Sequence, residues 1–527
     1  MELFKNKKEA SEFQPIFDIK PNIQIASLPD VKSRQDIDVR YVIIEKYAAI
    51  HIFWDKENNE LTYTVEEPGL DEKEKKILGV LEGGINELIN ISFINIKSTK
   101  AVIEYLEKNV RVLLSELRIA IPRDSFLKLM YYIYRDFVGL NEIEPLIRDY
   151  YIEDIECNGV NTPIYIVHRK YGNLKTNVIY KDARKLTSFV EKLAQKCGKF
   201  ISYASPLLDG ALPDGSRVNA TFTQDISSRG PSFTVRRFTK IPWTPVKLMQ
   251  FKTVSPEMLA YLWLLIENQA NIMIIGGTGS GKTSFLNALA FFIPPASRIV
   301  SIEDTKELNI LHENWLPNIT RQGIGATTEE GTREGEITLF DLLRESFRQR
   351  PDFLIVGEVR GKEAYVLFQG MASGHCSFGT MHAEDVETLI RRLETQPINL
   401  SPSLVESLDV VCIIAHGKFQ EKEVRKIKEI VEIIKVREGV GNVETNTPFI
   451  WDPANDRFYF KQDSYVFQKI VKNKGLNAQK LQREFNYRTK LLMAMYRNNI
   501  VGFKEVYEVL KEYYKRPEAV LKKFRII

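Results

Sequence analysis

Residues 276–283, GGTGSGKT, have the composition and spacing of a loop that binds phosphate groups. They match G-x-x-x-x-G-K-[ST], with the apolar run IMII before them and SFLNAL after them. Glycines let the backbone curl so that several N–H groups point at phosphate oxygens, and a helix that begins there adds the positive end of its dipole. In this pattern Lys282 neutralises the β- and γ-phosphates, and the hydroxyl of Thr283 binds Mg²⁺.

The alternative interpretation is a flexible glycine turn with an incidental lysine. The strand, loop and helix lie in the required order along the chain, which argues against that alternative. The sequence therefore predicts ATP and Mg²⁺ as ligands. The predicted nucleotide-binding residues are Gly276, Gly277, Thr278, Gly279, Ser280, Gly281, Lys282, Thr283 and Ser284.

A candidate for hydrolysis lies in FLIVGEVRG, where four apolar residues lead to Glu358, with Gly357 before it and Arg360 after it. A phosphate-loop ATPase needs a carboxylate on a neighbouring strand to hold the Mg²⁺ shell or to orient the attacking water. Gly357 occupies the usual aspartate position, so Glu358 is the residue predicted to polarise water. The alternative is a glutamate that only forms an ion pair with Arg360 or Arg350 at a strand end.

Two further strand ends carry polar residues. RIVSIEDTKEL supplies Glu303 and Asp304, one of which could serve the γ-phosphate and Mg²⁺. Helix capping is the interpretation favoured for Asp304 and Glu307, but not for Glu303. SGHCSFGTMHAED supplies His382, which has no cysteine or histidine partners at metal spacing, so a zinc site is not expected. A histidine at this position is suited to sense the γ-phosphate, although a lone histidine is more often structural.

The elements around these residues indicate a parallel sheet. From residue 271 to about 436, apolar runs alternate with amphipathic helices, and the strand candidates are IMIIGG, RIVSIED, FLIVGE and CSFGTMH. Such alternation is typical of a parallel sheet with helices on both faces. In residues 41–66 apolar and polar residues alternate, which predicts strands. The pattern at residues 71–118 predicts charged helices, and residues 124–240 are rich in turn-forming residues and arginines.

Composition excludes several classes of protein. The chain has 527 residues, 44% hydrophobic and 27% charged, with a formal net charge of +4, which predicts a multidomain soluble protein. The scattered residues Cys157, Cys197, Cys376 and Cys412 form no C-x-x-C pair, which favours a reducing cytoplasm. The sequence begins without an apolar signal segment, and no apolar run reaches the roughly 18 residues of a membrane helix. We expect any membrane role to come through a partner or a surface contact.

The order of the motifs resembles the secretion ATPase superfamily, the hexameric motors of type II and type IV secretion and of type IV pili. The G-x-x-x-x-G-K-T loop is followed by an acidic "Asp box" (Glu303 to Glu307), a Walker B strand written G-E rather than D-E, and a "His box" (Gly374 to Asp385). GLNEIEPLIRDYYIEDIECNG is similar to the archaeal branch, which includes the archaellum motor ATPase and adhesive-pilus assembly ATPases. The resemblance covers roughly residues 125–435.

This resemblance implies a role for each candidate. Glu358 would be the catalytic base, Glu303 a second carboxylate at the metal or water, His382 a contact of the γ-phosphate, and Arg360 a charge partner near the site. Arg217 and Arg236 match positions from which an N-terminal domain reaches the nucleotide, where such arginines stabilise the transferring phosphoryl group. A surface role is expected for Arg229 and Arg237.

The resemblance also implies the architecture and the partners. We expect an α/β fold: a RecA-like P-loop domain with a parallel sheet, preceded by a smaller α+β N-terminal domain. The expected parts are an α+β subdomain (1–120), an arginine-bearing subdomain (121–240), a hinge linker (241–248), the ATPase domain (249–440), and a C-terminal hairpin with helices (441–527). The partners would be five further copies in a homo-hexamer, a polytopic membrane platform protein and a membrane lipid surface, with the protein cytoplasmic and peripheral at the inner face of the membrane.

Two features depart from the family pattern. The tetracysteine zinc module of many bacterial type II secretion ATPases is missing, and the glycine-rich stretch at residues 321–337 is long. The second hypothesis for function is a ring ATPase or helicase that translocates nucleic acid, which a P-loop and a modest basic excess permit. No aromatic and basic stripe suited to stacking bases is present, so no nucleic acid is expected. A nucleotide-gated scaffold that does not hydrolyse ATP and a small-molecule kinase are weaker alternatives.

Overall fold

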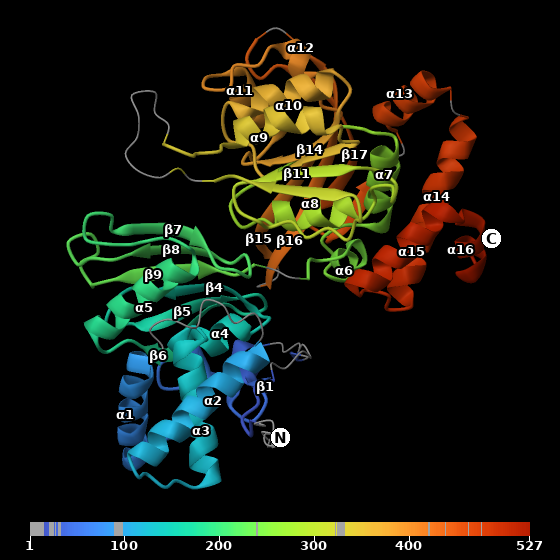
Figure 1. Cartoon of the computed structure of the whole chain (residues 1–527). Coiled ribbons are helices and arrows are strands. Elements are labelled where there is room, and N and C mark those ends of the chain that lie inside the picture. Colours follow the sequence, from blue (N-terminus) through green and yellow to red (C-terminus); the bar gives the residue numbers. More distant parts are fainter. Residues whose placement is uncertain are drawn as a thin grey trace, which may run out of the picture. The chain divides into compact units, whose positions relative to one another are not determined.

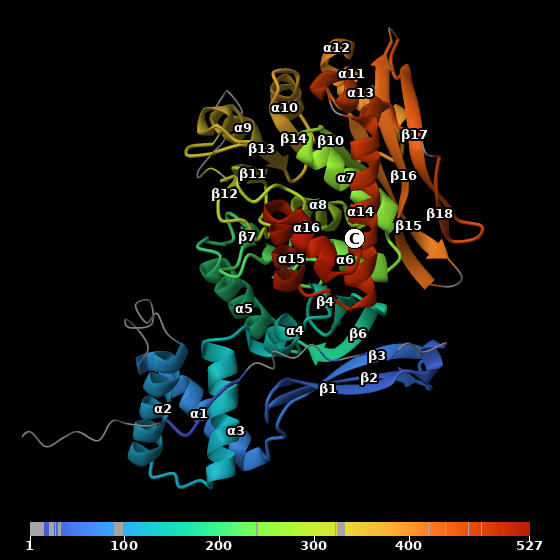
Figure 2. The same cartoon turned by 90° about the vertical axis from the view of Figure 1, so that its right-hand side faces the viewer.

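The computed structural model divides the chain into two compact units, Met1–Phe238 and Thr239–Ile527. Figures 1 and 2 show the elements of each unit in two perpendicular views. The structure describes residues 15–20, 26, 28–29, 33–88, 99–238, 241–321, 323, 333–419, 422–437, 439–461, 463–475 and 477–527. Most of the long glycine-rich stretch, residues 322 and 324–332, therefore lies outside the described residues.

A nine-stranded sheet runs through the first unit in the order β1-β2-β3-β6-β5-β4-β9-β8-β7. Neighbouring strands are antiparallel except β3 and β6, which are parallel. Because β3 pairs with β6, the parts expected at 1–120 and 121–240 share one sheet, and the boundary between them stays a prediction. The strands are β1(Asp38–Ile44), β2(Ala48–Asp55), β3(Glu60–Glu66), β4(Ile152–Cys157), β5(Pro163–His168), β6(Gly172–Ile179), β7(Leu207–Ala211), β8(Arg217–Thr221) and β9(Ser232–Arg236).

The helices of the first unit bury apolar faces. In α3, Phe126, Leu129, Met130 and Ile133 recur at helical spacing, and all are buried in one core with residues of the sheet. Helices α1, α2 and α3 contact one another beside the sheet (Figure 1). The helices are α1(Glu72–Leu88), α2(Thr99–Glu116), α3(Arg123–Phe137), α4(Glu144–Arg148) and α5(Ala183–Lys196), with 3₁₀ turns η1(Arg34–Asp36) and η3(Asn141–Ile143).

The second unit contains the expected parallel sheet. Its order is β12-β11-β13-β14-β10-β15-β16-β17-β18. The strands from β12 to β15 are parallel, and β15 to β18 are antiparallel. The strands are β10(Ile272–Gly276), β11(Ile299–Glu303), β12(Trp315–Ile319), β13(Phe353–Val356), β14(Cys376–Met381), β15(Val410–Phe419), β16(Lys422–Val436), β17(Val443–Asp452) and β18(Arg457–Phe460).

Both faces of this sheet are covered. Ile272 and Ile274 of β10 belong to one core, whereas Met273 and Ile275 belong to the other, as expected for strands that are apolar throughout. The first core includes residues of α7, α8 and the C-terminal helices, and the second includes residues of α9 to α12. The helices are α6(Pro245–Gln250), α7(Pro256–Glu267), α8(Lys282–Ala290), α9(Leu339–Ser346), α10(Glu363–Ala372), α11(Val386–Glu394) and α12(Pro402–Val405), with η4(Phe347–Gln349).

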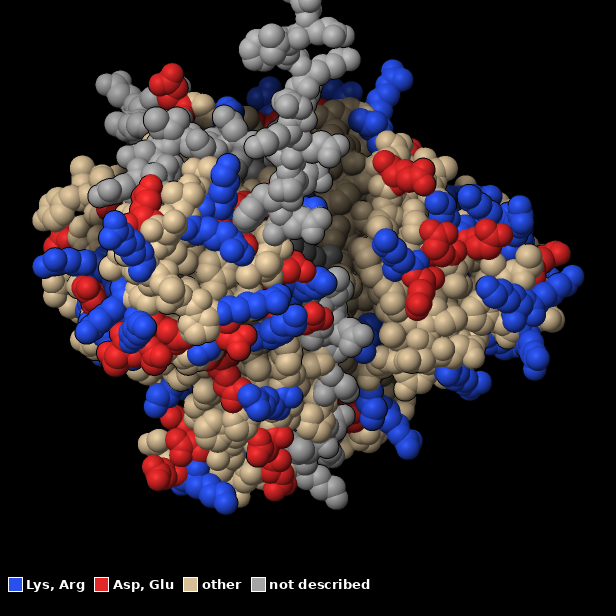
Figure 3. All heavy atoms as spheres, turned by 60° about the horizontal axis from the view of Figure 1, so that its bottom comes forward, with Lys and Arg blue, Asp and Glu red and all other residues tan. Residues whose placement is uncertain are grey.

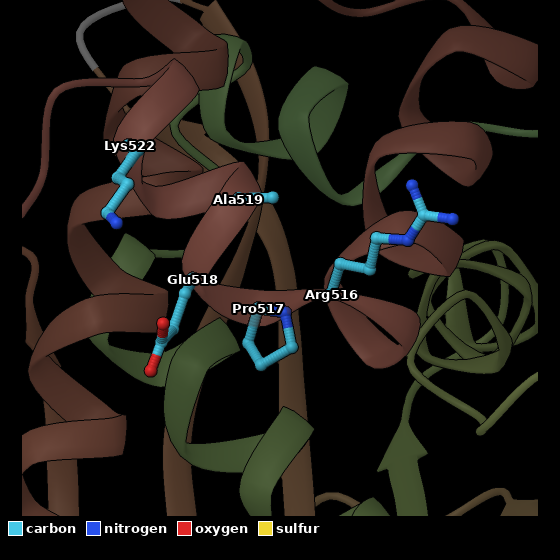
Figure 4. Close-up of a pocket in the computed structure, with 5 residues that line it drawn as sticks. All are labelled: Arg516, Pro517, Glu518, Ala519 and Lys522. Atoms are coloured by element: carbon cyan, nitrogen blue, oxygen red, sulfur yellow. The ribbon is translucent and has the colours of Figure 1, made fainter.

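The C-terminal helices are fixed to the sheet by a buried glutamate. Glu432 of β16 is fully buried and accepts hydrogen bonds from the Tyr261 hydroxyl at 2.5 Å, the Tyr465 N–H at 2.8 Å and the Asn446 amide at 2.7 Å. These helices are α13(Tyr465–Lys474), α14(Ala478–Arg497), α15(Phe503–Lys515) and α16(Pro517–Lys523). A surface hollow drawn in Figure 4 is lined by Arg516, Pro517, Glu518, Ala519 and Lys522 at the start of α16, apart from the strand ends that carry the candidate residues.

Half of the expected linker is a buried helix. Thr244 caps α6, and Val246 and Leu248 lie in the core of the second unit. Apolar burial holds these residues in place, so a hinge would have to lie before Thr244. Within the described residues, no helix combines the length and the apolar character needed to span a membrane.

Candidate active site

The phosphate loop connects β10 to α8, as its sequence predicts. Its first glycine allows a close approach to the neighbouring strand: a Cβ on Gly276 would lie 2.5 Å from the carbonyl oxygen of Ile414 in β15. Any side chain there would push the loop away from the sheet. The loop ends at Lys282, and Thr283 and Ser284 follow half-buried in the first turn of α8.

Lys282 is buried against the loop. Its Nζ donates to the carbonyl oxygens of Gly276 at 3.1 Å and Gly277 at 2.9 Å. The same Nζ lies 3.3 Å from Nδ1 of His382, at the end of β14. The lysine ammonium is therefore held inside the curl of the loop and in contact with a second strand end.

Glu358 follows β13 and joins this group. One carboxylate oxygen lies 3.0 Å from Nε2 of His382, and the other pairs with the guanidinium of Arg360. Burial acts to raise the pKa of Glu358, but the hydrogen bond and charge of Arg360, with His382 and Lys282, outweigh it, so the pKa lies below its usual value. Glu358 is consequently an ionised carboxylate at neutral pH.

His382 is uncharged in this setting. Burial and the nearby charge of Lys282 lower the pKa of His382 in spite of the attraction of Glu358. A neutral imidazole can accept a hydrogen bond on one ring nitrogen and donate one from the other. His382 can thus accept from Lys282 through Nδ1, while its Nε2 lies 3.0 Å from a Glu358 oxygen that has no hydrogen-bond partner among the described residues, so the ring lies in contact with both the phosphate loop and the carboxylate.

Glu303 ends β11 and has a different environment. One carboxylate oxygen accepts hydrogen bonds from the N–H groups of Glu307 at 3.0 Å and Leu308 at 2.9 Å. The other oxygen is buried and has no hydrogen-bond partner among the described residues. Burial raises the pKa of Glu303 to about 7, although the two N–H groups oppose this shift. The Asp304 and Glu307 pair was expected to cap a helix, but no helix begins there in the described chain, so that expectation is wrong.

Gly357 provides the space that Glu303 occupies. A Cβ on Gly357 would lie 3.0 Å from Cγ of Glu303, closer than most real Cβ contacts. An aspartate at position 357 would therefore displace Glu303. The neighbouring strand β11 explains the G-E order at this strand end. Its Glu303 supplies the carboxylate that an aspartate at position 357 would otherwise supply.

Oxygen ligands suitable for Mg²⁺ are present around this loop. Mg²⁺ prefers oxygen donors and is commonly held by one or two carboxylates together with substrate phosphates. The unpartnered oxygen of Glu303 and the buried Ser280 hydroxyl, which also has no partner among the described residues, are groups that a bound ligand could satisfy. The donor set therefore fits a Mg²⁺–nucleotide complex, with Thr283 and Glu303 as the residues that would hold the metal.

The candidate arginines of the first unit lie next to each other on neighbouring strands. Arg217 of β8 pairs in register with Arg236 of β9. Arg217 forms a two-pronged ion pair with Asp209, at 3.2 Å and 3.0 Å, whereas the Arg236 side chain is exposed. Their predicted role at the nucleotide stays a prediction. The expected surface role of Arg237 is wrong: burial lowers its pKa to about 10, and it donates to the carbonyls of Asp149 and Ile152.

Two residues near the site had no recognisable signal in the sequence. Glu363 accepts hydrogen bonds from the N–H groups of Arg360 at 2.5 Å and Gly361 at 2.7 Å, which fixes the turn after Glu358. Arg425 of β16 donates from Nε to the carbonyl oxygen of Gly279 at 2.9 Å. Arg425 lies 146 positions from Gly279, and no local pattern predicts such a contact.

Comparisons with known proteins relate the chain to a family. The family described as Type II/IV secretion system protein matches residues 138–433. An uncharacterized protein of Methanocaldococcus jannaschii is 38% identical over 398 residues, 75% of this chain and 70% of that protein. The Type IV secretion system protein PtlH of Bordetella pertussis is 28% identical over 268 residues, 45% of this chain and 78% of that protein. The solved structure of the Legionella pneumophila ATPase DotB is 16% identical and covers 72% of this chain and 95% of that chain, with a TM-score of 0.41.

Proposed function

The chain belongs to the Type II/IV secretion system protein family, and from this premise we propose that it is a Mg²⁺-dependent ATPase motor. In this proposal it hydrolyses ATP to ADP and phosphate. The observation that carries the proposal is the continuous row of side chains from Lys282 through His382 and Glu358 to Arg360. The row joins the phosphate loop to an ionised carboxylate, as water-driven cleavage of a terminal phosphate requires.

Each residue has a defined part in the proposed reaction. The loop N–H groups and Lys282 bind the phosphates; Thr283 and Glu303 would hold Mg²⁺, which would supply positive charge at the phosphate oxygens. Glu358 accepts a hydrogen bond from the attacking water and takes its proton as the water oxygen bonds to the terminal phosphorus and the bond to the ADP oxygen breaks; the proton then passes to the released phosphate. The lowered pKa of Glu358 keeps its carboxylate ionised at neutral pH, so the carboxylate can orient and polarise the water. His382 contacts both Lys282 and Glu358, so it is placed to respond when the terminal phosphate leaves.

The finer part of the proposal concerns assembly. We propose a homo-hexamer that powers assembly or rotation of an archaeal type IV pilus-like filament or archaellum through a membrane platform protein, at the inner face of the membrane. The similarity to an archaeal protein and to a type IV secretion protein supports this proposal. In such a ring, Arg217 and Arg236 would stabilise the phosphoryl group in the transition state.

Phosphate release measured on purified full-length protein tests the ATPase. Lys282→Ala should abolish ATP binding, because the loop loses the cation that neutralises the phosphates. Glu358→Gln should bind ATP but release phosphate at least about 100-fold more slowly. Glu345→Gln, which changes an exposed glutamate, serves as the matched control. Equal turnover in Glu358→Gln and wild type would contradict the assigned role of Glu358.

The arginine proposal has its own test. Arg217→Ala should slow phosphate release by about 10³-fold while the affinity for ATP changes little, since the charge it stabilises develops in the transition state. Arg229→Ala, an exposed arginine of the same unit, is the control. A loss of ATP affinity without a loss of turnover at saturation would show that Arg217 is no arginine finger.

Electron micrographs of the same preparations would test whether the protein forms the proposed hexameric ring.

The charges on one face of the described chain do not favour the nucleic-acid alternative. On the described part of the face drawn in Figure 3, lysines and arginines lie interspersed with aspartates and glutamates, without a continuous basic track. A protein that follows a nucleic-acid backbone needs such a track. Stimulation of phosphate release by single-stranded DNA or RNA, and not by anionic lipid vesicles, would favour this alternative over the filament motor.

A further inference from the structure

The hairpin β15–β16 extends beyond the end of β10, alongside the phosphate loop. β10 ends at Gly276, which pairs with Ile414 of β15, while β15 continues to Phe419. The next part of the hairpin pairs His416 with Arg425. At a rise of about 3.3 Å per residue, this pair lies roughly two residues, or about 7 Å, past the end of β10. The hairpin thus brings Arg425 next to the loop.

Arg425 makes a directed contact with the loop. Its Nε donates to the carbonyl oxygen of Gly279 at 2.9 Å, and its Cδ lies 3.6 Å from the place that a Cβ on Gly281 would occupy. The rest of the side chain is exposed, and no ion pair joins it to a carboxylate among the residues that the structure describes. The interaction with Gly279 is therefore the contact that orients the guanidinium.

The contact determines how one peptide group of the loop is turned. The carbonyl of Gly279 and the N–H of Ser280 belong to the same planar peptide, in which the two groups point in opposite directions. A charged donor on the carbonyl side therefore turns the Ser280 N–H away from Arg425. Gly279 has φ 69°, a conformation that glycine enters and leaves easily, so this peptide is held by its hydrogen bonds: a long one from the Ser280 N–H to the Gly277 carbonyl, at 3.4 Å, and the shorter one from Arg425.

We propose that Arg425 is a positioning residue that holds the Gly279–Ser280 peptide in the orientation that binds phosphate. The inference rests on the proposed function, because it requires that residues 276–283 bind a nucleotide. Arg425 acts through the loop, so it strengthens the binding of any ligand with a phosphate chain, whether or not a base is attached. It contributes little to turnover once the site is saturated.

Calorimetric titrations of wild type and Arg425→Ala with Mg²⁺–ADP and with Mg²⁺–pyrophosphate test the proposal. Both affinities should fall by about tenfold, the size expected for one hydrogen bond to a charged group. Phosphate release should show a raised KM with kcat nearly unchanged. Arg425→Lys should recover part of the affinity, because an ammonium can also donate to the Gly279 carbonyl. Lys428→Ala removes another exposed cation of β16 and should match wild type.

Each outcome decides between explanations. Unchanged affinities in Arg425→Ala would overturn the proposal. A loss for ADP but not for pyrophosphate would also overturn it, because Arg425 would then contact the base or ribose. If Arg425→Ala fails to fold, as seen from its melting temperature without ligand, Arg425→Gln replaces it and should lose affinity for both ligands. If wild type binds neither ligand, the proposed function fails, and the inference fails with it.

Discussion

Two neighbouring strands, β11 and β13, end in glutamates whose environments are opposite. Glu303 after β11 is buried, has a free oxygen within the described chain, and has a pKa raised to about 7. Glu358 after β13 is paired with Arg360 and approached by His382, and its pKa is lowered. The strands are parallel and paired, so both side chains emerge at the same edge of the sheet.

This difference shows how adjacent carboxylates acquire separate tasks. Burial without a countercharge favours the neutral form, whereas a neighbouring guanidinium favours the charged form. A bound cation such as Mg²⁺ would favour the charged form of Glu303, whereas Glu358 is charged without one. Titratable groups whose pKa values are pushed apart commonly mark distinct roles at an active site. The proposed division is metal binding for Glu303 and water orientation for Glu358.

Replacing Glu303, the buried carboxylate, should have the largest effect on the contrast between Glu303 and Glu358. Glu303→Gln keeps the shape and the acceptor for Glu307 and Leu308 but cannot become charged, so kcat should fall by about 100-fold and the Mg²⁺ requirement should rise. In wild type, activity at low Mg²⁺ should increase as pH rises through about 7, and the variant should lack this rise. Steady-state rates measured across pH and Mg²⁺ concentration give both the Mg²⁺ requirement and the pH dependence. The exposed Glu345→Gln is the control, and an unchanged pH profile in Glu303→Gln would remove Glu303 from the metal site.

Removing Arg360, the countercharge of Glu358, should make the environment of Glu358 more like that of Glu303. Without Arg360, burial would be opposed only by the charges of His382 and Lys282, so the pKa of Glu358 should rise above its wild-type value. Because activity requires the ionised form, the decrease in rate on acidification should occur at higher pH than in wild type. A pH–rate profile of Arg360→Ala measures this shift. Arg348→Ala, which removes an exposed arginine, should keep the wild-type profile.

Filling the space between the strand ends should perturb the site more mildly. The methyl group of Gly357→Ala would press on Cγ of Glu303, so we expect kcat to fall by about threefold with little change in KM. Gly357→Asp restores the usual acidic position and should be slower still, because it adds bulk and a like charge. Gly417→Ala adds a methyl group into open space and is the control. Wild-type rates in Gly357→Asp would contradict the packing explanation for the G-E order.

The smallest expected effect is on stability. A carboxyl whose pKa is raised on folding binds more protons in the folded state, so the free energy of unfolding should decrease from about pH 4.5 to about pH 7 and then level off. Glu303→Gln lacks this contribution, so relative to wild type it should be more stable at pH 8 than at pH 5. The difference in melting temperature should be a few degrees. Equal differences at the two pH values would show that the pKa of Glu303 is not raised.

Much of the nucleotide-binding half could be predicted from the sequence because its signals are local. The runs IMIIGG, RIVSIED, FLIVGE and CSFGTMH do form β10, β11, β13 and β14, and α7 begins after Ser255 with Pro256 in its first turn. Two prolines predict a linker at residues 241–248, and the structure adds that Val246 and Leu248 in its second half lie in a helix and pack into the core. Turn residues indicate where a chain can bend, but burial decides whether it is held.

The sequence by itself determined the phosphate loop and the order of the acidic and histidine strand ends, since these depend on residues that are contiguous in the chain. The tertiary structure alone decided that Glu303 occupies the space beside Gly357, that His382 bridges Lys282 and Glu358, and that Arg425 contacts Gly279. Such contacts join strands that are distant in sequence, and the pKa of a carboxyl depends on burial and on charges brought to it by folding. No local pattern contains that information.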